Sequence, residues 1–144
     1  MADLNALTDR FNEAWNAHDA EAVAQLTAED AELTVSQQKI HGRAEGKAYN
    51  EAWFRGFPDA TTKAVKRIIS GNCVVEEGWF EGTNTGPFQT TMGEIPATGK
   101  RVRGPYCSVN EYEGELIKSS RLYFDAMDVA VQMGVVPMPA GATA

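Results

Sequence analysis

The chain has 144 residues, of which 43% are hydrophobic and 23% are charged, as in an ordinary soluble globular protein. This length predicts one domain, large enough to enclose a ligand-sized pocket. The formal net charge of −7 and the dispersed basic residues argue against a nucleic-acid-binding surface, which needs clustered lysine and arginine.

The sequence also argues against a membrane protein. No stretch approaches the roughly 20 apolar residues of a membrane-spanning helix. The first residues carry neither the basic region nor the apolar run of a signal peptide. Cys73 and Cys107 lie far apart without metal-binding spacing, and we expect both to be reduced. A cytoplasmic location is therefore expected.

The N-terminal part of the chain is expected to be mostly helical. Apolar residues recur at helical spacing, and Asp19 is a good N-cap for the second helix. Helices are predicted over residues 4–18, 20–27 and 44–55, with a short strand over 31–35. His41-Gly42 is read as a turn, and Pro58 marks the exit from the third helix.

The C-terminal part is expected to consist of strands and one short helix. Strands are predicted over 62–69, 73–83, 101–112 and 116–124, a loop over 85–99 and a helix over 126–134. The tail from Pro137 is expected to be loose. Helices followed by antiparallel strands indicate an α+β fold. We expect one domain over 1–144, ordered over about 4–136, in which a curved antiparallel sheet wraps three helices around a pocket.

A carboxylate that directly follows the last strand is the main candidate for chemistry. Ser119, Arg121, Tyr123 and Asp125 share one strand face. If that face lines the pocket, desolvation disfavours the charged form of Asp125, which would suit it to exchange protons near neutral pH. The alternative is that Asp125 only caps the following helix, because aspartate is a preferred N-cap.

The residues that join Asp125 depend on the register of the last hairpin. A two-residue turn at Glu113-Gly114 would place Gly104, Tyr106 and Ser108 on the face of Arg121 and Tyr123. A three-residue loop would place Arg103, Val109 and Glu111 there instead. We prefer the first register.

Other residues are weaker candidates. His18 is expected to make a local contact and His41 to lie in a turn, with a pocket role as its alternative. Trp15, Trp53 and Trp79 are expected in the core or in the pocket wall. Met92 is expected in a mobile loop rather than a lid. Two histidines without carboxylates at ligand spacing do not predict a metal site. Arg121 either pairs with Glu111 or Glu81, the preferred reading, or holds a substrate anion.

Several short motifs resemble a known family in their order and spacing. The segments Trp15–Asp19 and 28–30 resemble the opening helices of nuclear transport factor 2-like proteins. Phe57-Pro58-Asp59, 82–86, 96–100, Tyr123-Phe124-Asp125 and 132–134 resemble the SnoaL-like polyketide cyclase branch. The resemblance covers about residues 4–136.

This resemblance implies a cone-shaped α+β barrel with a deep pocket, a homodimer packed through the outer sheet face, and catalysis without metal or organic cofactor. It implies an intramolecular aldol-type cyclisation with Asp125 as general acid/base. Two positions depart from the family pattern: Asn84 replaces a frequent histidine, and Ala126 replaces a common glutamine. Asn84 can polarise a carbonyl group but cannot titrate.

Three functional hypotheses follow. The first is a cofactor-independent enzyme acting next to a carbonyl group in an apolar pocket, with Asp125 as acid/base and Asn84, Tyr106 or Tyr123 as hydrogen-bond donor. The second is a binding module for an apolar small molecule. The third is a hydrolase or isomerase on the same scaffold, because one fold can host many reactions.

Overall fold

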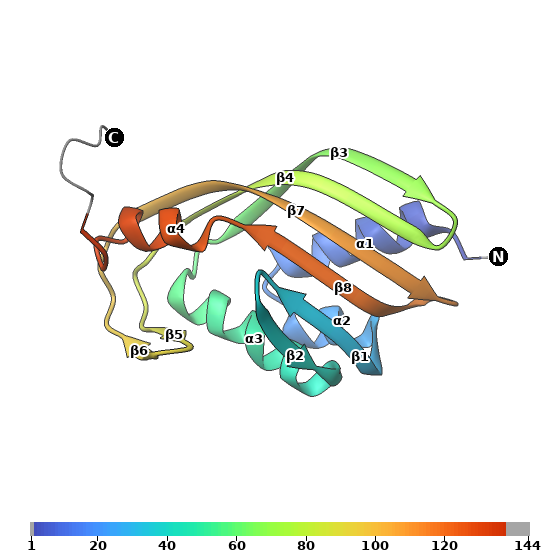
Figure 1. Ribbon diagram of the computed structural model, residues 1–144, viewed down its shortest axis with the longest axis horizontal. Helices are drawn as coiled ribbons and strands as arrows, with labels where there is room; N and C mark the ends of the chain where they lie inside the picture. The colour runs from blue at the N-terminus through green and yellow to red at the C-terminus, as the bar shows by residue number, and fades with distance from the viewer. Residues whose placement is uncertain (1, 138–144) are drawn as a thin grey trace.

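The computed structural model describes residues 2–137 (Figure 1). The predicted loose tail therefore lies almost entirely outside the described residues. The helices are α1 (Leu4–Asn16), α2 (Ala20–Gln25), α3 (Gly42–Gly56) and α4 (Ala126–Gln132). The strands are β1 (Thr27–Val35), β2 (Gln38–His41), β3 (Thr61–Ser70), β4 (Cys73–Thr83), β5 (Phe88–Thr90), β6 (Gly93–Ile95), β7 (Arg101–Glu113) and β8 (Leu116–Phe124).

Helix starts follow the capping residues in the sequence. The Asp3 carboxylate accepts a hydrogen bond from the Ala6 amide at 3.1 Å, and Asp19 accepts one from the Ala22 amide at 2.9 Å. These bonds satisfy amides that have no partner within the helix. The prediction that Asp19 caps a helix is confirmed.

Six strands form one mixed sheet in the order β2-β1-β8-β7-β4-β3. The prediction of an antiparallel sheet needs one correction, because β1 and β8 run parallel and the other pairs are antiparallel. The parallel pair is possible because α3 and the long strands separate β1 from β8 in sequence. Figure 1 shows a curved, unclosed layer with α1, α2 and α3 on one side.

Three strands were not predicted. The edge strand β2 pairs only with β1, and the hairpin β5–β6 forms a separate two-stranded sheet inside the predicted loop. In addition, β1 begins at Thr27, four residues before the predicted start. These segments are short or lack a clear alternation of apolar and polar residues, which is the signal for a strand.

The hydrophobic core is divided into two clusters. Leu7, Leu26, Val74, Tyr112 and Ile117 form one cluster. Phe57, Ala60, Val102 and Met133 form the other, with aromatic side chains of α1, α3 and β4 packed against it. None of the helices within residues 2–137 is long and apolar enough to cross a membrane.

Candidate functional site

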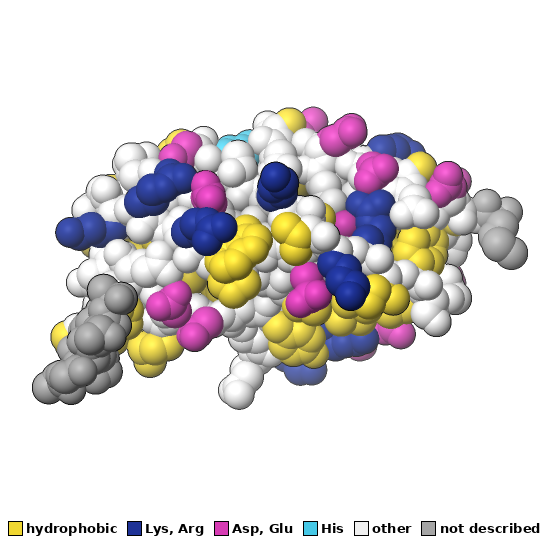
Figure 2. Space-filling view, turned by 90° about the horizontal axis from the view of Figure 1, so that it is seen from above, with side chains coloured by type: hydrophobic (Ala, Val, Ile, Leu, Met, Phe, Trp, Pro, Cys, Tyr) yellow, Lys and Arg dark blue, Asp and Glu magenta, His cyan; other side chains and the backbone are white. Residues whose placement is uncertain are grey.

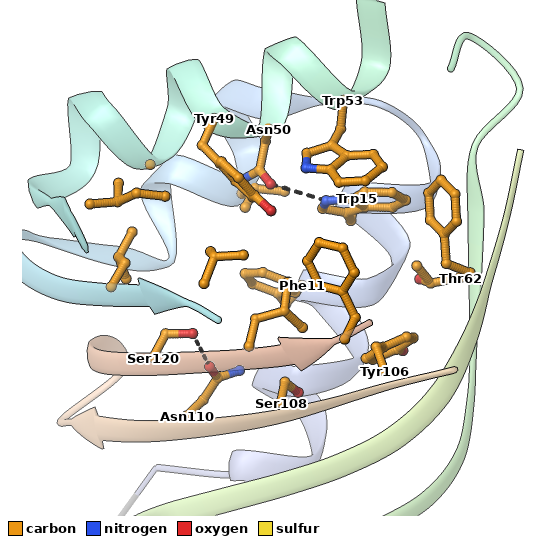
Figure 3. Close-up of a pocket in the computed structure, with 18 of the residues that line it drawn as sticks. Phe11, Trp15, Tyr49, Asn50, Trp53, Thr62, Tyr106, Ser108, Asn110 and Ser120 are labelled. Carbon is orange, nitrogen blue, oxygen red and sulfur yellow. Dashed lines mark hydrogen bonds between the residues drawn. The ribbon is translucent and has the colours of Figure 1, made fainter. Parts of the chain in front are cut away.

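A cavity of about 190 Å³ lies between the concave face of the sheet and the helices (Figure 3). It extends from Val23 and Ala24 of α2 to Asp128 and Val129 of α4. Pockets for drug-sized ligands usually measure ~300–1,000 Å³, and a ~150 Å³ apolar cavity can hold benzene. The cavity therefore fits a ligand with about one ring.

A group of aromatic side chains lines the cavity. They are Phe11, Trp15, Tyr49, Trp53, Phe80, Tyr106 and Phe124. The Trp53 ring meets Phe80 edge-on at 5.2 Å and Phe124 at 5.8 Å between centroids. The Trp15 indole N–H donates to the Asn50 amide oxygen at 3.1 Å. The predicted pocket positions of Trp15 and Trp53 agree with this lining.

The space for the Tyr106 ring is created by a glycine on the neighbouring strand. A Cβ at Gly78 would lie 2.6 Å from the Tyr106 hydroxyl oxygen and 2.5 Å from the Lys63 carbonyl oxygen. Both distances are shorter than van der Waals contact. The Tyr106 ring therefore lies across β4 at Gly78 and directs its hydroxyl toward β3. This direction leads away from β8 and Asp125.

The preferred register of the β7–β8 hairpin was wrong. Arg121 and Tyr123 share the face of Val109 and Glu111, as in the alternative register. Arg121 lies opposite Val109, and Ser119 lies opposite Glu111. Arg121 and Tyr123 therefore point outward, and neither lines the cavity. Arg121 pairs with Glu111 at 3.0 Å, as the structural reading predicted, and Tyr123 is 48% exposed.

The cause is a β-bulge rather than a longer turn. Glu113 pairs with Leu116 across a two-residue turn that starts at Gly114, where φ is +62°. This turn lies one residue later than predicted, so each residue of β7 would pair with the residue two positions later in β8. Because side chains alternate with period two, that shift alone would leave the same side chains on each face of the sheet. Between Tyr112–Ile117 and Glu111–Ser119, however, Lys118 is an extra residue in β8. One extra residue turns the following side chains to the opposite face.

Asp125 caps a helix, as one of the two readings predicted, and it also borders the cavity. It is the N-cap of α4, and its carboxylate accepts a hydrogen bond from the Asp128 amide at 2.9 Å. It also lines the cavity, because the chain leaves the strand alternation after Phe124. The residue is exposed, so the expected desolvation of its carboxylate is not observed. Asp125 lies at the mouth of the cavity.

Asn84 has a structural position instead of the expected place in the pocket. The residue is fully buried and does not line the cavity. Its amide nitrogen donates to the carbonyl oxygens of Gly56 and Gly86 at 2.9 and 3.0 Å, and its amide oxygen accepts two bonds from Thr98 at 2.8 Å. With both ends of the amide occupied, Asn84 has no free donor for a substrate carbonyl.

The remaining candidates lie outside the cavity lining. His41 is exposed at the start of α3, and the His18 ring contacts the Ala60 carbonyl oxygen at 2.7 Å. Trp79 is on the outer face of the sheet, with the Arg103 guanidinium 3.9 Å from its ring centroid. Met92 is 95% exposed at the β5–β6 turn. Among residues 2–137, no three His, Cys, Asp or Glu side chains gather as a metal site would require.

The most buried carboxylate in the cavity was missed by sequence reasoning. The Glu76 side chain is 5% exposed and binds Arg67 at 2.9 Å and the Asn12 amide at 3.1 Å. Val75, Glu76 and Glu77 alternate along β4, so only the sheet register shows which glutamate points inward. Arg67 also binds Asp9, and the cluster thereby ties α1 to β3 and β4.

Two half-buried tyrosines contribute neutral hydroxyl groups to the interior. Burial raises the pKa of Tyr49 in the cavity wall. Burial, together with the negative charge of Glu76, raises the pKa of Tyr106. Both phenols therefore stay protonated at neutral pH and keep a hydrogen to donate. The cavity can hold a small apolar molecule and offer it hydroxyl and amide donors.

Comparisons with known proteins agree with this geometry. A model of the SnoaL-like domain matches residues 8–120. No curated protein sequence matches the chain.

Several solved structures share the fold at low sequence identity. A candidate SnoaL-like polyketide cyclase from Jannaschia sp. CCS1 is 21% identical, covers 93% of this chain and 92% of its own, and has a TM-score of 0.80. IdmH from Streptomyces antibioticus, a candidate polyketide cyclase, is 19% identical over 92% and 99% of the two chains, with a TM-score of 0.75. A ketosteroid isomerase-like protein from Catenulispora acidiphila, solved with trimethylamine, is 18% identical over 96% and 97%, with a TM-score of 0.74.

Proposed function

Because the chain belongs to the SnoaL-like domain family, we propose that it is a cofactor-independent enzyme that transfers a proton at a carbon next to a carbonyl group. The substrate is a small, largely apolar molecule. An aldol-type cyclisation or an isomerisation would both begin with this step. The observation that supports the proposal is an aromatic-walled cavity with the Asp125 carboxylate at its mouth.

Asp125 is suited to accept a proton because no cation neutralises it. Among the described residues it forms no salt bridge, whereas Glu76 inside the cavity is paired with Arg67. A general base needs a free carboxylate oxygen within reach of the substrate carbon. Asp125 uses one oxygen for the Asp128 amide, which leaves the other oxygen available.

The experiment is a search for enzyme-catalysed hydrogen–deuterium exchange. Cyclic ketones and polyketide-like esters are incubated in D₂O, and proton NMR follows the hydrogens next to each carbonyl. This readout detects proton transfer even when no product accumulates. We expect Asp125→Asn to lower the exchange rate at least ~100-fold, within the usual range for a general base. Asparagine caps helices as well as aspartate does, so α4 should remain intact.

Asp128→Asn provides the matched control. Asp128 is a second exposed carboxylate at the same mouth, and its side chain accepts a hydrogen bond from Gln132 at 2.7 Å. This variant should retain most of the exchange activity. If Asp125→Asn keeps the wild-type rate on a compound that the wild type exchanges, Asp125 is not the base.

A binding module is the second candidate function. The exposure of Asp125 and the structural position of Asn84 both favour it, because they reduce the number of catalytic groups inside the cavity. Tight binding of a panel compound without any exchange would support this function. The hydrolase hypothesis also rested on Asp125, Arg121 and Asn84, and it loses two of them, since Arg121 faces outward and Asn84 lies in a structural network.

We also propose that two copies pair through the outer face of the sheet. Ile68 of β3 and Tyr123 of β8 lie on this face and are 52% and 48% exposed, and Val65 at the bulge of β3 is 61% exposed. Figure 2, which views the molecule from above, shows hydrophobic side chains interspersed with charged ones. Sedimentation velocity tests this directly: a dimer in the wild type should become a monomer in Ile68→Glu, and a monomeric wild type would refute the pairing.

A further inference from the structure

The side-chain amide nitrogen of Asn110 is open to the cavity and is a donor without a hydrogen-bond partner among the described residues. Asn110 of β7 is 8% exposed and lines the cavity. Its amide oxygen accepts a hydrogen bond from the Ser120 hydroxyl at 2.6 Å. Among the described residues, its amide nitrogen has no hydrogen-bond partner. Figure 3 shows this nitrogen directed along the cavity floor, away from Ser120.

The surroundings make this donor selective. Leu33, Ile117, Val23 and Ala24 also line the cavity and offer no side-chain acceptor. A ligand that fills the cavity covers this donor. An oxygen atom on the ligand can accept its hydrogen, whereas a methyl group would leave the covered donor without a partner, which is costly. The Ser120 hydroxyl holds the amide plane, which keeps the nitrogen side toward the cavity.

This donor is remote from the carboxylate at the mouth. Ser120, opposite Asn110, is five residues before Asp125 along β8. At ~3.3 Å per residue, that separation is roughly 16 Å along the strand. A substrate oxygen held by Asn110 therefore does not belong to the carbonyl group next to the carbon from which Asp125 would remove a proton.

We propose that the Asn110 amide is a second recognition point, which donates a hydrogen bond to an oxygen atom at the inner end of the ligand. The substrate class is then an elongated, largely apolar molecule: a part with about one ring and an oxygen function lies in the cavity near Asn110, and a second carbonyl group extends to the open mouth near Asp125. This inference rests on the proposed function in one respect: it requires that the cavity binds the ligand.

The test uses two compounds of nearly equal shape. Cyclohexyl methyl ketone carries an acceptor oxygen, and isopropenylcyclohexane replaces that oxygen with a CH₂ group. Isothermal titration calorimetry measures both dissociation constants without an optical signal, so the absorption of the ketone does not interfere. The ratio of the two dissociation constants measures how much the ketone oxygen contributes to binding. We expect Asn110→Leu to reduce the preference for the ketone about two- to tenfold relative to the wild type.

Asn12→Leu is the matched control, because Asn12 is another amide in the cavity wall and its nitrogen already donates to the Glu76 carboxylate. This variant should keep the wild-type ratio. An unchanged ratio in Asn110→Leu, or a loss in Asn12→Leu alone, would overturn the proposal.

A second readout uses only the wild-type protein and therefore does not depend on whether Asn110→Leu folds. In the wild type, the side-chain amide protons of Asn110 should shift in ¹H–¹⁵N NMR spectra with the ketone and not with the alkene. Equal shifts with both compounds would contradict the hydrogen bond. If neither compound binds, the cavity fails as a binding site and the inference fails with it. If both bind without discrimination, the inference alone fails and the exchange test of Asp125 still stands.

Discussion

The two faces of strands β7 and β8 carry different kinds of side chains, although the strands are continuous. The inner face presents Tyr106, Ser108 and Asn110 to the cavity. The outer face carries ion pairs such as Arg121–Glu111 and exposed apolar groups such as Tyr123. The comparison teaches that the register of pairing, rather than the type of residue, selects which side chains can meet a ligand.

The largest effect is expected from removing the residue that sets this register. Deletion of Lys118 eliminates the bulge, so the residues of β8 before or after it must exchange faces. The exchange would bury Arg121 or expose Ile117 together with neighbouring residues of β8, and the summed cost is of the same order as the ~5–15 kcal/mol by which a domain is stable. We expect no folded protein, as judged by far-UV circular dichroism and NMR dispersion.

Lys118→Ala is the control for this deletion. It removes the exposed ion pair with Asp30 but keeps the number of residues in β8. This variant should fold like the wild type. A folded deletion variant with an unchanged cavity would mean that the bulge does not determine the two faces.

A smaller loss of stability is expected when one ion pair on either face is weakened, and the loss should differ between the two faces. Glu76→Gln removes a charge from the buried cluster with Arg67 and Asn12, whereas Glu111→Gln weakens the half-exposed pair with Arg121. Breaking a buried pair costs ~3–5 kcal/mol, and we expect about 2–3 kcal/mol because Arg67 keeps Asp9 as a partner. The outer variant should lose less than ~1 kcal/mol. Urea denaturation measures both, and equal losses would contradict a difference in burial.

The smallest effect on stability near neutral pH is expected from the ionisation of the tyrosines on the inner face. Burial raises the pKa of Tyr49, Tyr106 and Tyr112. In the unfolded chain a tyrosine ionises at pH ~10, so these phenols favour folding below that pH. The stabilisation is lost as the pH rises above ~10, because only the unfolded state then releases the protons. Thermal unfolding between pH 8 and 11 should show a falling midpoint, with a smaller fall in Tyr49→Phe.

A rising midpoint over the same pH range would contradict the burial of these hydroxyl groups. Absorbance at 295 nm gives an independent check, since the inner tyrosines should ionise only at the onset of unfolding.

Local signals in the sequence predicted most elements of the fold. Asp19 and Asp125 mark helix starts because a carboxylate can accept backbone hydrogen bonds, and both cap helices in the structure. The parallel pairing of β1 with β8 could not be predicted in this way, because it joins segments about 90 residues apart. The bulge at Lys118 likewise leaves no mark in composition or periodicity.

The same limit applies to the candidate site. Asp125, Trp15, Trp53 and Tyr106 were predicted and line the cavity. Asn110 was missed although it shares the strand face of Tyr106 and Ser108, because the sequence does not show that its amide oxygen binds Ser120 while its nitrogen faces the cavity. Asn84 was assigned to the site from resemblance, but its hydrogen bonds to loop backbone and Thr98 depend on contacts that no local pattern encodes.

The most direct test of the account compares the two faces in the presence of a ligand. Methyl-labelled protein is titrated with cyclohexyl methyl ketone, and NMR follows Leu33 and Leu122 in the cavity and Val65 and Val109 outside it. The account predicts saturable shifts of Leu33 and Leu122, with Val65 and Val109 unchanged. Shifts confined to Val65 and Val109, or none at saturating ketone, would contradict the claim that the inner face of the sheet is the functional one.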